Sequence, residues 1–166
     1  MKKLIFLLAV LMGFGLLPAC GSGDEPTEED YFTVRRISTK TEARLGITYD
    51  EVAATFSSGD LFYGNSIRAI RKPGENLGSH VVHCYVLKNP DFRIKYGDLN
   101  TGMNKSAVMA VFNGDEEVST WEDGLNLYAE KTIGGTVYTI IVGLNDDGTI
   151  HHIYVTDDLT SVPDTP

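Results

Sequence analysis

The chain has 166 residues and a formal net charge of -9, with 14 lysines and arginines against 23 aspartates and glutamates. A hydrophobic content of 42% allows a packed core and excludes a chain that is disordered throughout. The acidic balance argues against a dedicated nucleic-acid binder, and two cysteines cannot form a disulfide framework or a cysteine-rich zinc site.

The N-terminal segment has the pattern of a secretory signal. Lys2 and Lys3 precede an apolar run, Leu4 to Leu17, that is shorter than the roughly 20 residues of a membrane span. The run ends in Leu17-Pro18-Ala19-Cys20, which resembles the lipobox of bacterial lipoproteins. The resemblance implies removal of residues 1–19, lipid on Cys20, and an anchored position in the bacterial cell envelope, periplasmic or surface-exposed. An ordinary signal peptide with a chance cysteine is the alternative.

Both ends of the mature chain are predicted to lack regular structure. Residues 20–31 are interpreted as the lipidated Cys20 and a disordered tether, because Gly21 to Asp30 contain five acidic residues and no large apolar one. The tether fits a solvated spacer, and its acids also resemble the export signal of some surface lipoproteins. Residues 159–166, with Pro163 and Pro166, are predicted to be a flexible tail.

An internal repeat lies between these ends. Residues 46–56 and 102–112 match at a constant offset of 56, with four identical pairs: Gly46/Gly102, Val52/Val108, Ala54/Ala110 and Phe56/Phe112. Thr48 and Asn104 are good N-cap residues, and Thr48 forms a capping box with Glu51. Each repeat therefore predicts a short helix that buries its valine and phenylalanine.

Strand signals follow each predicted helix. The strands are predicted at 66–71, 80–88 and 92–96 in the first half, and at 125–132, 136–144 and 149–156 in the second. A further helix is considered at Ser38 to Leu45. Turn signals such as Gly134-Gly135 join consecutive strands as hairpins, which means antiparallel pairing and an α+β class. Two tandem helix–three-strand units are predicted, over 32–97 and 98–158.

The repeated pattern resembles that of the BamE/SmpA–BLIP-like group. In this pattern a glycine, an apolar residue, a cap residue, a valine and a phenylalanine come in order, and three antiparallel strands follow. The resemblance implies one curved antiparallel sheet with the helices on one face. Two departures stand out. Only Cys84 is available where the β-lactamase inhibitory member has disulfides, and the turns after Phe56 and Phe112 differ from those of BamE-like proteins.

The sequence contains no catalytic motif of a known class, so the protein is predicted not to be an enzyme and to need no cofactor. His151 and His152 are adjacent in a strand and are expected to point to opposite faces, where they cannot chelate one ion. A metal pair joining His83 and His151 is the alternative, but no ligand spacing supports it, and no metal is predicted. Asn145 to Gly148 is interpreted as a hairpin turn rather than a calcium loop. Cys84 is expected to be buried.

The remaining candidates belong to a binding surface. His83 and Tyr85 are expected to face away from Val82, Cys84 and Val86, and with Arg93 and Lys95 they are predicted to line the open sheet face. Ordinary residues on a wet sheet face are an equal alternative. The predicted function is that of a non-catalytic envelope lipoprotein that binds a protein partner and no nucleic acid. The alternatives are an assembly factor of the BamE type and an inhibitor of a secreted hydrolase such as a serine β-lactamase.

Overall fold

The structure, a computed structural model, describes residues 31–56, 66–71 and 80–163. The predicted signal segment, Cys20 and the tether up to Asp30 lie outside the described residues. The described strands are β1 (Thr33–Arg36), β2 (Thr41–Arg44), β3 (Ile67–Arg71), β4 (Val82–Leu87), β5 (Phe92–Ile94), β6 (Ser119–Asp123), β7 (Asn126–Ile133), β8 (Thr136–Leu144) and β9 (Ile150–Thr156). The described helices are α2 (Tyr49–Phe56), α4 (Lys105–Asn113) and two 3-10 turns, η1 (Tyr96–Asp98) and η2 (Leu159–Ser161).

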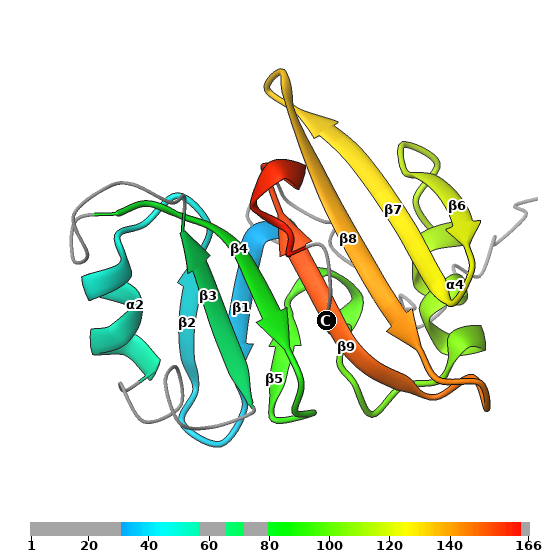
Figure 1. The fold of residues 1–166 in the computed structure, drawn as a ribbon, viewed down its shortest axis with the longest axis horizontal. Coiled ribbons are helices and arrows are strands. Elements are labelled where there is room, and N and C mark those ends of the chain that lie inside the picture. The colour runs from blue at the N-terminus through cyan, green and yellow to red at the C-terminus, as the bar shows by residue number, and fades with distance from the viewer. Residues whose placement is uncertain (1–30, 57–65, 72–79, 164–166) are drawn as a thin grey trace, which may run out of the picture.

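Six strands form one antiparallel sheet in the order β3-β4-β9-β8-β7-β6. Its longest strands, β7, β8 and β9, run across the molecule, with α4 near β6 and β7 and α2 on the other side, near β2 and β3 (Figure 1). The pairing of β4 with β9 joins the first part of the chain to the second. Both halves therefore contribute to a single sheet.

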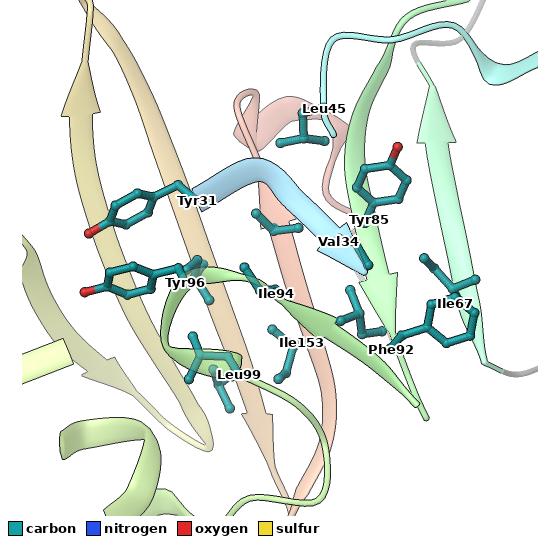
Figure 2. Packing of buried hydrophobic residues seen from close by; sticks show 14 of the residues in the cluster. Tyr31, Val34, Leu45, Ile67, Tyr85, Phe92, Ile94, Tyr96, Leu99 and Ile153 are labelled. Atoms are coloured by element: carbon teal, nitrogen blue, oxygen red, sulfur yellow. The ribbon is translucent and has the colours of Figure 1, made fainter. Parts of the chain in front are cut away.

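A smaller sheet, in the order β2-β1-β5, shares the core of the larger one. Val34 of β1 lies opposite Ala43 of β2 and Ile94 of β5, and all three are buried. They belong to the same apolar cluster as one side of the six-stranded sheet, here called its inner face (Figure 2). The inner-face side chains are Ile67, Tyr85, Leu87, Leu127, Ala129, Ile140, Val142, Ile153 and Val155.

The two predicted helices are confirmed, with their caps. The Thr48 hydroxyl accepts from the Glu51 amide, and the Glu51 carboxylate accepts in return from the Thr48 amide at 2.8 Å, which is a capping box. The Asn104 side chain accepts from the Ala107 amide at 2.9 Å. Val52 and Phe56 of α2, like Val108 and Phe112 of α4, are buried in the shared core. Amphipathic spacing therefore locates both helices correctly.

The predicted arrangement of two tandem helix–three-strand units in one curved sheet is wrong. The described chain is mostly β and has two sheets, because β5 pairs with β1 instead of extending the larger sheet. Ser38 to Leu45 is not a helix, since residues 41–44 form β2 and pair with β1. The second half also adds β6, a fourth strand after α4.

The repeated motif is a local likeness only. The cap residue of each helix forms an isolated bridge to the residue just before a central strand, Thr48 to Val81 and Asn104 to Thr149. The two glycines of the motif differ in role. Gly46 has a φ of +80° and needs its missing side chain, whereas Gly102 is not in the left-handed region and donates to the Asn100 side chain. A short match can thus specify a helix start without specifying a whole unit.

The region predicted as a tail begins with an ordered turn. Asp158 caps η2 by accepting from the Thr160 amide at 3.0 Å, Ser161 is buried, and Val162 packs on the six-stranded sheet. Within the described ranges, neither α-helix has the length or apolar character needed to cross a lipid bilayer.

Candidate functional site

The four predicted surface residues do not form one site. Arg93 and Lys95 lie on the small sheet or at its end, whereas His83 and Tyr85 lie on β4 of the large sheet. His83 Nδ1 lies 2.9 Å from a carboxylate oxygen of Asp157, whereas Tyr85 is buried in the shared core. Only Arg93 and Lys95 are brought together.

Tyr85 is buried in the inner core, which corrects the prediction that it faces outward. Its ring is 0% exposed, its hydroxyl donates to the Arg44 carbonyl at 3.0 Å, and burial raises the pKa of its phenol. Tyr85 does lie on the side opposite to Cys84 and Val86, as alternation predicts, but the shared core is on the side of Tyr85 and Leu87, while Cys84 and Val86 are buried in a smaller cluster. A β-bulge in the pairing of β3 with β4, where Ile70 and Arg71 lie opposite Cys84 and Val82, moves Val82 to the side of Tyr85. The extra residue, His83, reverses the alternation, so that Val82 and Tyr85 share the inner face.

The other side of the six-stranded sheet, here called the outer face, carries a row of directly opposed residues. The register connects one residue from every strand in a line, here called the aromatic row: Trp121, Tyr128, Ile141, Tyr154, Val86 and Arg68. Such cross-strand neighbours stabilise a sheet through side-chain contact. Here they also produce a continuous apolar stripe on a face that no described sheet or α-helix covers.

The β6 end of the aromatic row is open to solvent. The rings of Trp121 and Tyr128 stack at 4.9 Å between centroids and 5° between planes. Trp121 nevertheless remains 41% exposed, and nearby Leu125 is 49% exposed. Large apolar side chains held in place but left in water are typical of interaction surfaces.

A pocket of about 320 Å³ lies next to this end of the row. It is lined by Leu125, Asn126, Tyr128, Ile141, Leu144, His151, His152, Tyr154, Val162 and Pro163. Gly143 of β8 lies opposite Asn126 on β7 and His152 on β9, two residues that line the pocket. A Cβ at Gly143 would lie 2.3 Å from the His152 ring, so this glycine is required for close packing. Val162 and Pro163, which follow η2, form one wall; η2 itself is drawn in red near the end of β9 (Figure 1).

His151 and His152 lie together at this pocket, which corrects the prediction that they point apart. A second β-bulge places Gly143 opposite His152 but Leu144 opposite Ile150, so His151 is the extra residue. The two Nδ1 atoms are 2.5 Å apart and the rings pack edge to face. Burial, with a smaller effect of His151, lowers the pKa of His152 to about 4, and burial also lowers the pKa of His151. Both rings are therefore neutral at pH 7, and one can donate to the other.

The other side chains that could bind a metal or react have structural roles instead. Among the described residues, no set of three or more His, Cys, Asp and Glu side chains gathers in a way that could hold a metal ion. Cys84 is buried on the outer face beneath Tyr154 and Val86, as expected, and burial raises the pKa of its thiol to about 12. Asp147 accepts from the Thr149 amide and hydroxyl within the predicted hairpin turn.

Sequence reasoning did not identify Trp121, Tyr128 and Tyr154 as candidates. Tyr128 alternates with the buried Leu127 and Ala129, and Tyr154 alternates with Ile153 and Val155. The sequence signal available for these two tyrosines was an aromatic residue at an outward-facing position of a strand. The strand of Trp121 gave none, because Ser119 to Asp123 is exposed throughout and has no apolar alternation.

Comparison of the chain with protein-family models, with curated proteins and with solved structures finds no match of any kind.

Proposed function

We propose that this chain is a lipid-anchored protein of the bacterial cell envelope that binds a partner protein and does not catalyse a reaction. The anchor is supported by the order of basic start, apolar run and Cys20 in the sequence. The binding role is supported by the outer face, which combines the aromatic row with a pocket. This surface replaces the group His83, Tyr85, Arg93 and Lys95 as the candidate interface.

One observation carries the binding role: Trp121 stacks flat on Tyr128 while 41% of its surface faces solvent. Rigid aromatic side chains provide much contact area for little loss of conformational entropy, and they dominate the energetics of many protein interfaces. Leu125, at the rim of the pocket, extends the same apolar area.

The pocket favours a particular kind of contact. Its walls are mainly apolar, from Leu125, Ile141 and Val162, with Asn126 and the histidine pair as the polar groups. A volume of about 320 Å³ is at the small end for a ligand site and has room for one large side chain. The partner is therefore a protein that inserts an aromatic or aliphatic side chain.

The two alternative functions have less support. The assembly factor and the hydrolase inhibitor both rest on the resemblance to the BamE/SmpA–BLIP-like group, which implies one curved sheet, and the chain has two sheets of unequal size instead. A general protein-binding role depends only on the surface that is present.

The anchor can be tested in growing bacteria. With a labelled fatty acid supplied, we expect the wild-type protein to become labelled and to sediment with membranes. The Cys20→Ser variant should take up no label and should leave the membrane fraction. Equal labelling of the two proteins would contradict the anchor.

The binding surface can be tested by capture from detergent-solubilised membranes. A variant combining Trp121→Ser with Leu125→Ser should lose the captured partner, because both changes remove exposed apolar area from the proposed interface. Ile37→Ser is the matched control, since Ile37 is 39% exposed but lies in the turn between β1 and β2 of the other sheet. Retention of the partner by the double variant, or its loss from the control, would contradict the proposed surface.

A further inference from the structure

Strand β6 lies at an edge of the six-stranded sheet. Among the described strands only β7 pairs with it, in an unbroken register from Ser119 to Asp123 (Figure 1). All five residues of β6 are exposed, so both sides of this strand contact water, and not only the outer face. An edge strand presents backbone donors and acceptors with which another strand can pair.

The hairpin between β6 and β7 determines which backbone groups point away from the sheet. Asp123 and Asn126 lie opposite each other across a two-residue loop, and residues that flank such a loop exchange both backbone hydrogen bonds. Because hydrogen-bonded and non-hydrogen-bonded pairs alternate, Trp121 also bonds to β7. Thr120 and Glu122 therefore direct their N–H and C=O groups toward the open edge.

The next hairpin gives the same assignment independently. Ile133 and Thr136 flank a second two-residue loop, so alternate residues of β7, counted back from Ile133, bond to β8. The residues between them, which include Tyr128, are left to bond to β6, and Tyr128 lies opposite Trp121. Two hairpins thus agree on which groups of β6 face the edge.

This edge lacks most of the features that keep sheet edges from pairing. Proline, lysine and β-bulges are common protective features, and β6 contains none of them. Its only charged residues, Glu122 and Asp123, are acidic. Negative charge repels an acidic strand and attracts a basic one, so the edge favours a partner strand that carries lysine or arginine.

The charges around β6 have the same sign. Residues 105–133, which include α4, β6 and β7, contain six acidic residues and two lysines, and both lysines already form ion pairs with carboxylates of this segment. Five further acidic residues in 24–30 precede Tyr31, whose hydroxyl donates to Asp115, so they add charge of the same sign. A second copy of the chain would bring this charge twice, which disfavours it as the occupant of the edge.

Trp121 supplies an apolar contact for an added strand. Its ring lies on the outer face, stacked on Tyr128, and is 41% exposed. By alternation the side chains of Thr120 and Glu122 lie on the other side of the sheet. Neighbouring strands contact each other through side chains on the same side, so an apolar residue would cover Trp121 and a basic residue would lie beside Glu122.

We propose that the partner protein pairs an extended segment, in which apolar and basic residues alternate, with the open edge of β6. The inference rests on the proposed binding role and names the kind of segment that the partner supplies. When a strand is added to a sheet edge, main-chain hydrogen bonds give affinity and alternate side chains give specificity. Both contributions are present at β6.

A synthetic peptide of about nine residues, in which lysine and valine alternate, is the probe. The chain from Gly21 onward, which contains every described residue, is used for amide hydrogen exchange followed by NMR. At roughly millimolar peptide, the Thr120 and Glu122 amides should exchange at least about fivefold more slowly. A peptide of alternating glutamate and valine, and a fully N-methylated lysine–valine peptide, should leave both amides unchanged.

Two variants of one residue separate the backbone from the side chain. Thr120→Pro removes an N–H that faces the edge, whereas Thr120→Ala removes only the side chain. Because this N–H makes no hydrogen bond to β7, proline is tolerated there, and thermal unfolding should show both variants folded. Thr120→Pro should weaken binding of the peptide and of the membrane partner at least about tenfold, and Thr120→Ala by less than about twofold.

Equal binding by the two Thr120 variants, or no protection of the two amides by the lysine–valine peptide, would overturn the proposal. So would an unfolded Thr120→Pro, which would place this N–H inside the sheet, or a wild-type dimer that Thr120→Pro abolishes, which would assign the edge to a second copy. If the Trp121→Ser, Leu125→Ser variant loses the partner while Thr120→Pro retains it, the proposed function stands and edge pairing fails. If the double variant retains the partner and Thr120→Pro loses it, the outer face fails and edge pairing stands.

Discussion

The outer face of the six-stranded sheet and the outward side of the three-stranded sheet, here called the small-sheet face, lie on opposite sides of one shared core. Both are the outward phases of antiparallel strands, yet the first carries Trp121, Tyr128 and Tyr154 and the second carries Arg35, Arg93 and Lys95. The inward phases are almost uniformly apolar because packing constrains them. The difference indicates that outward-facing residues can vary without destabilising the core. Substitutions on one face should therefore leave the other face unchanged.

The two faces also differ in how regular their strands are. The described pairings of the small sheet have an unbroken register, whereas the large sheet has two β-bulges, at His83 and at His151. Each bulge changes which side a neighbouring side chain occupies. In the large sheet, therefore, the chemistry of the outer face depends on backbone irregularities as well as on sequence alternation.

The largest expected effect on stability is at Tyr85, where it tests whether this residue belongs to the core or to the surface. Tyr85→Ala should destabilise the protein by about 3–5 kcal/mol, because it empties a fully buried aromatic site. Tyr85→Phe, which removes only the hydrogen bond to Arg44, should cost about 1 kcal/mol. Chemical denaturation measures both. A loss below about 0.5 kcal/mol for Tyr85→Ala would match a surface residue and would contradict the burial of Tyr85 in the shared core.

The next effect tests how His152, one of the residues that line the pocket, packs on Gly143. Gly143→Val should destabilise the fold by about 1–3 kcal/mol, because the new side chain meets the His152 ring. Gly114→Ala is the control, since Gly114 has a φ of -79° and a Cβ there would be no closer than 3.4 Å to another atom. Thermal unfolding compares the two. A neutral Gly143→Val would mean that His152 does not lie over this glycine.

The outer face should respond to pH. The pKa of His152 is lowered to about 4 in the folded protein, so the unfolded chain binds more protons between the ordinary value of 6.5 and pH 4. Stability should therefore fall as pH falls through this window, by on the order of 2 kcal/mol, with His151 adding a smaller effect of the same sign. Denaturant midpoints of the wild type and His152→Gln measure this. An equally steep fall in the variant would assign the effect to other groups.

The smallest effect on stability is expected at Trp121. Trp121→Ser should change the free energy of unfolding by less than about 1 kcal/mol, because the side chain is partly exposed at the edge of the sheet. The same variant should weaken partner binding at least about tenfold, as expected for an aromatic hot spot. A large loss of stability with unchanged binding would reverse the role given to this face.

The sequence predicts the strongly periodic elements well. The capped repeats locate α2 and α4, and the predicted strand at 136–144 coincides with β8. It does not predict β1 and β2, because Thr33–Arg36 and Thr41–Arg44 each bury few apolar side chains and read as polar segments. β6 is missed for the same reason, as every residue in it is exposed.

The candidate site was harder to predict than the fold. Strict alternation separates His151 from His152, and this error comes from one inserted residue in β9. Alternation also places Tyr85 opposite to Cys84 and Val86, but it does not tell which of the two sides faces the shared core, because both sides of β4 are buried. A bulge depends on how two strands meet, which local sequence does not encode. The aromatic row is likewise a property of register across six strands, so no single segment of the sequence contains it.

The central claim is that the partner binds the outer face, and site-specific photocrosslinking in cells tests it most directly. A photoreactive phenylalanine analogue replaces Leu125, which is 49% exposed beside the pocket, or Glu42, which is exposed on the small-sheet face. The Leu125 position should yield a crosslinked protein of defined mass, and the Glu42 position should not yield that product. The same product from Glu42 alone, or no protein product from Leu125, would contradict the account.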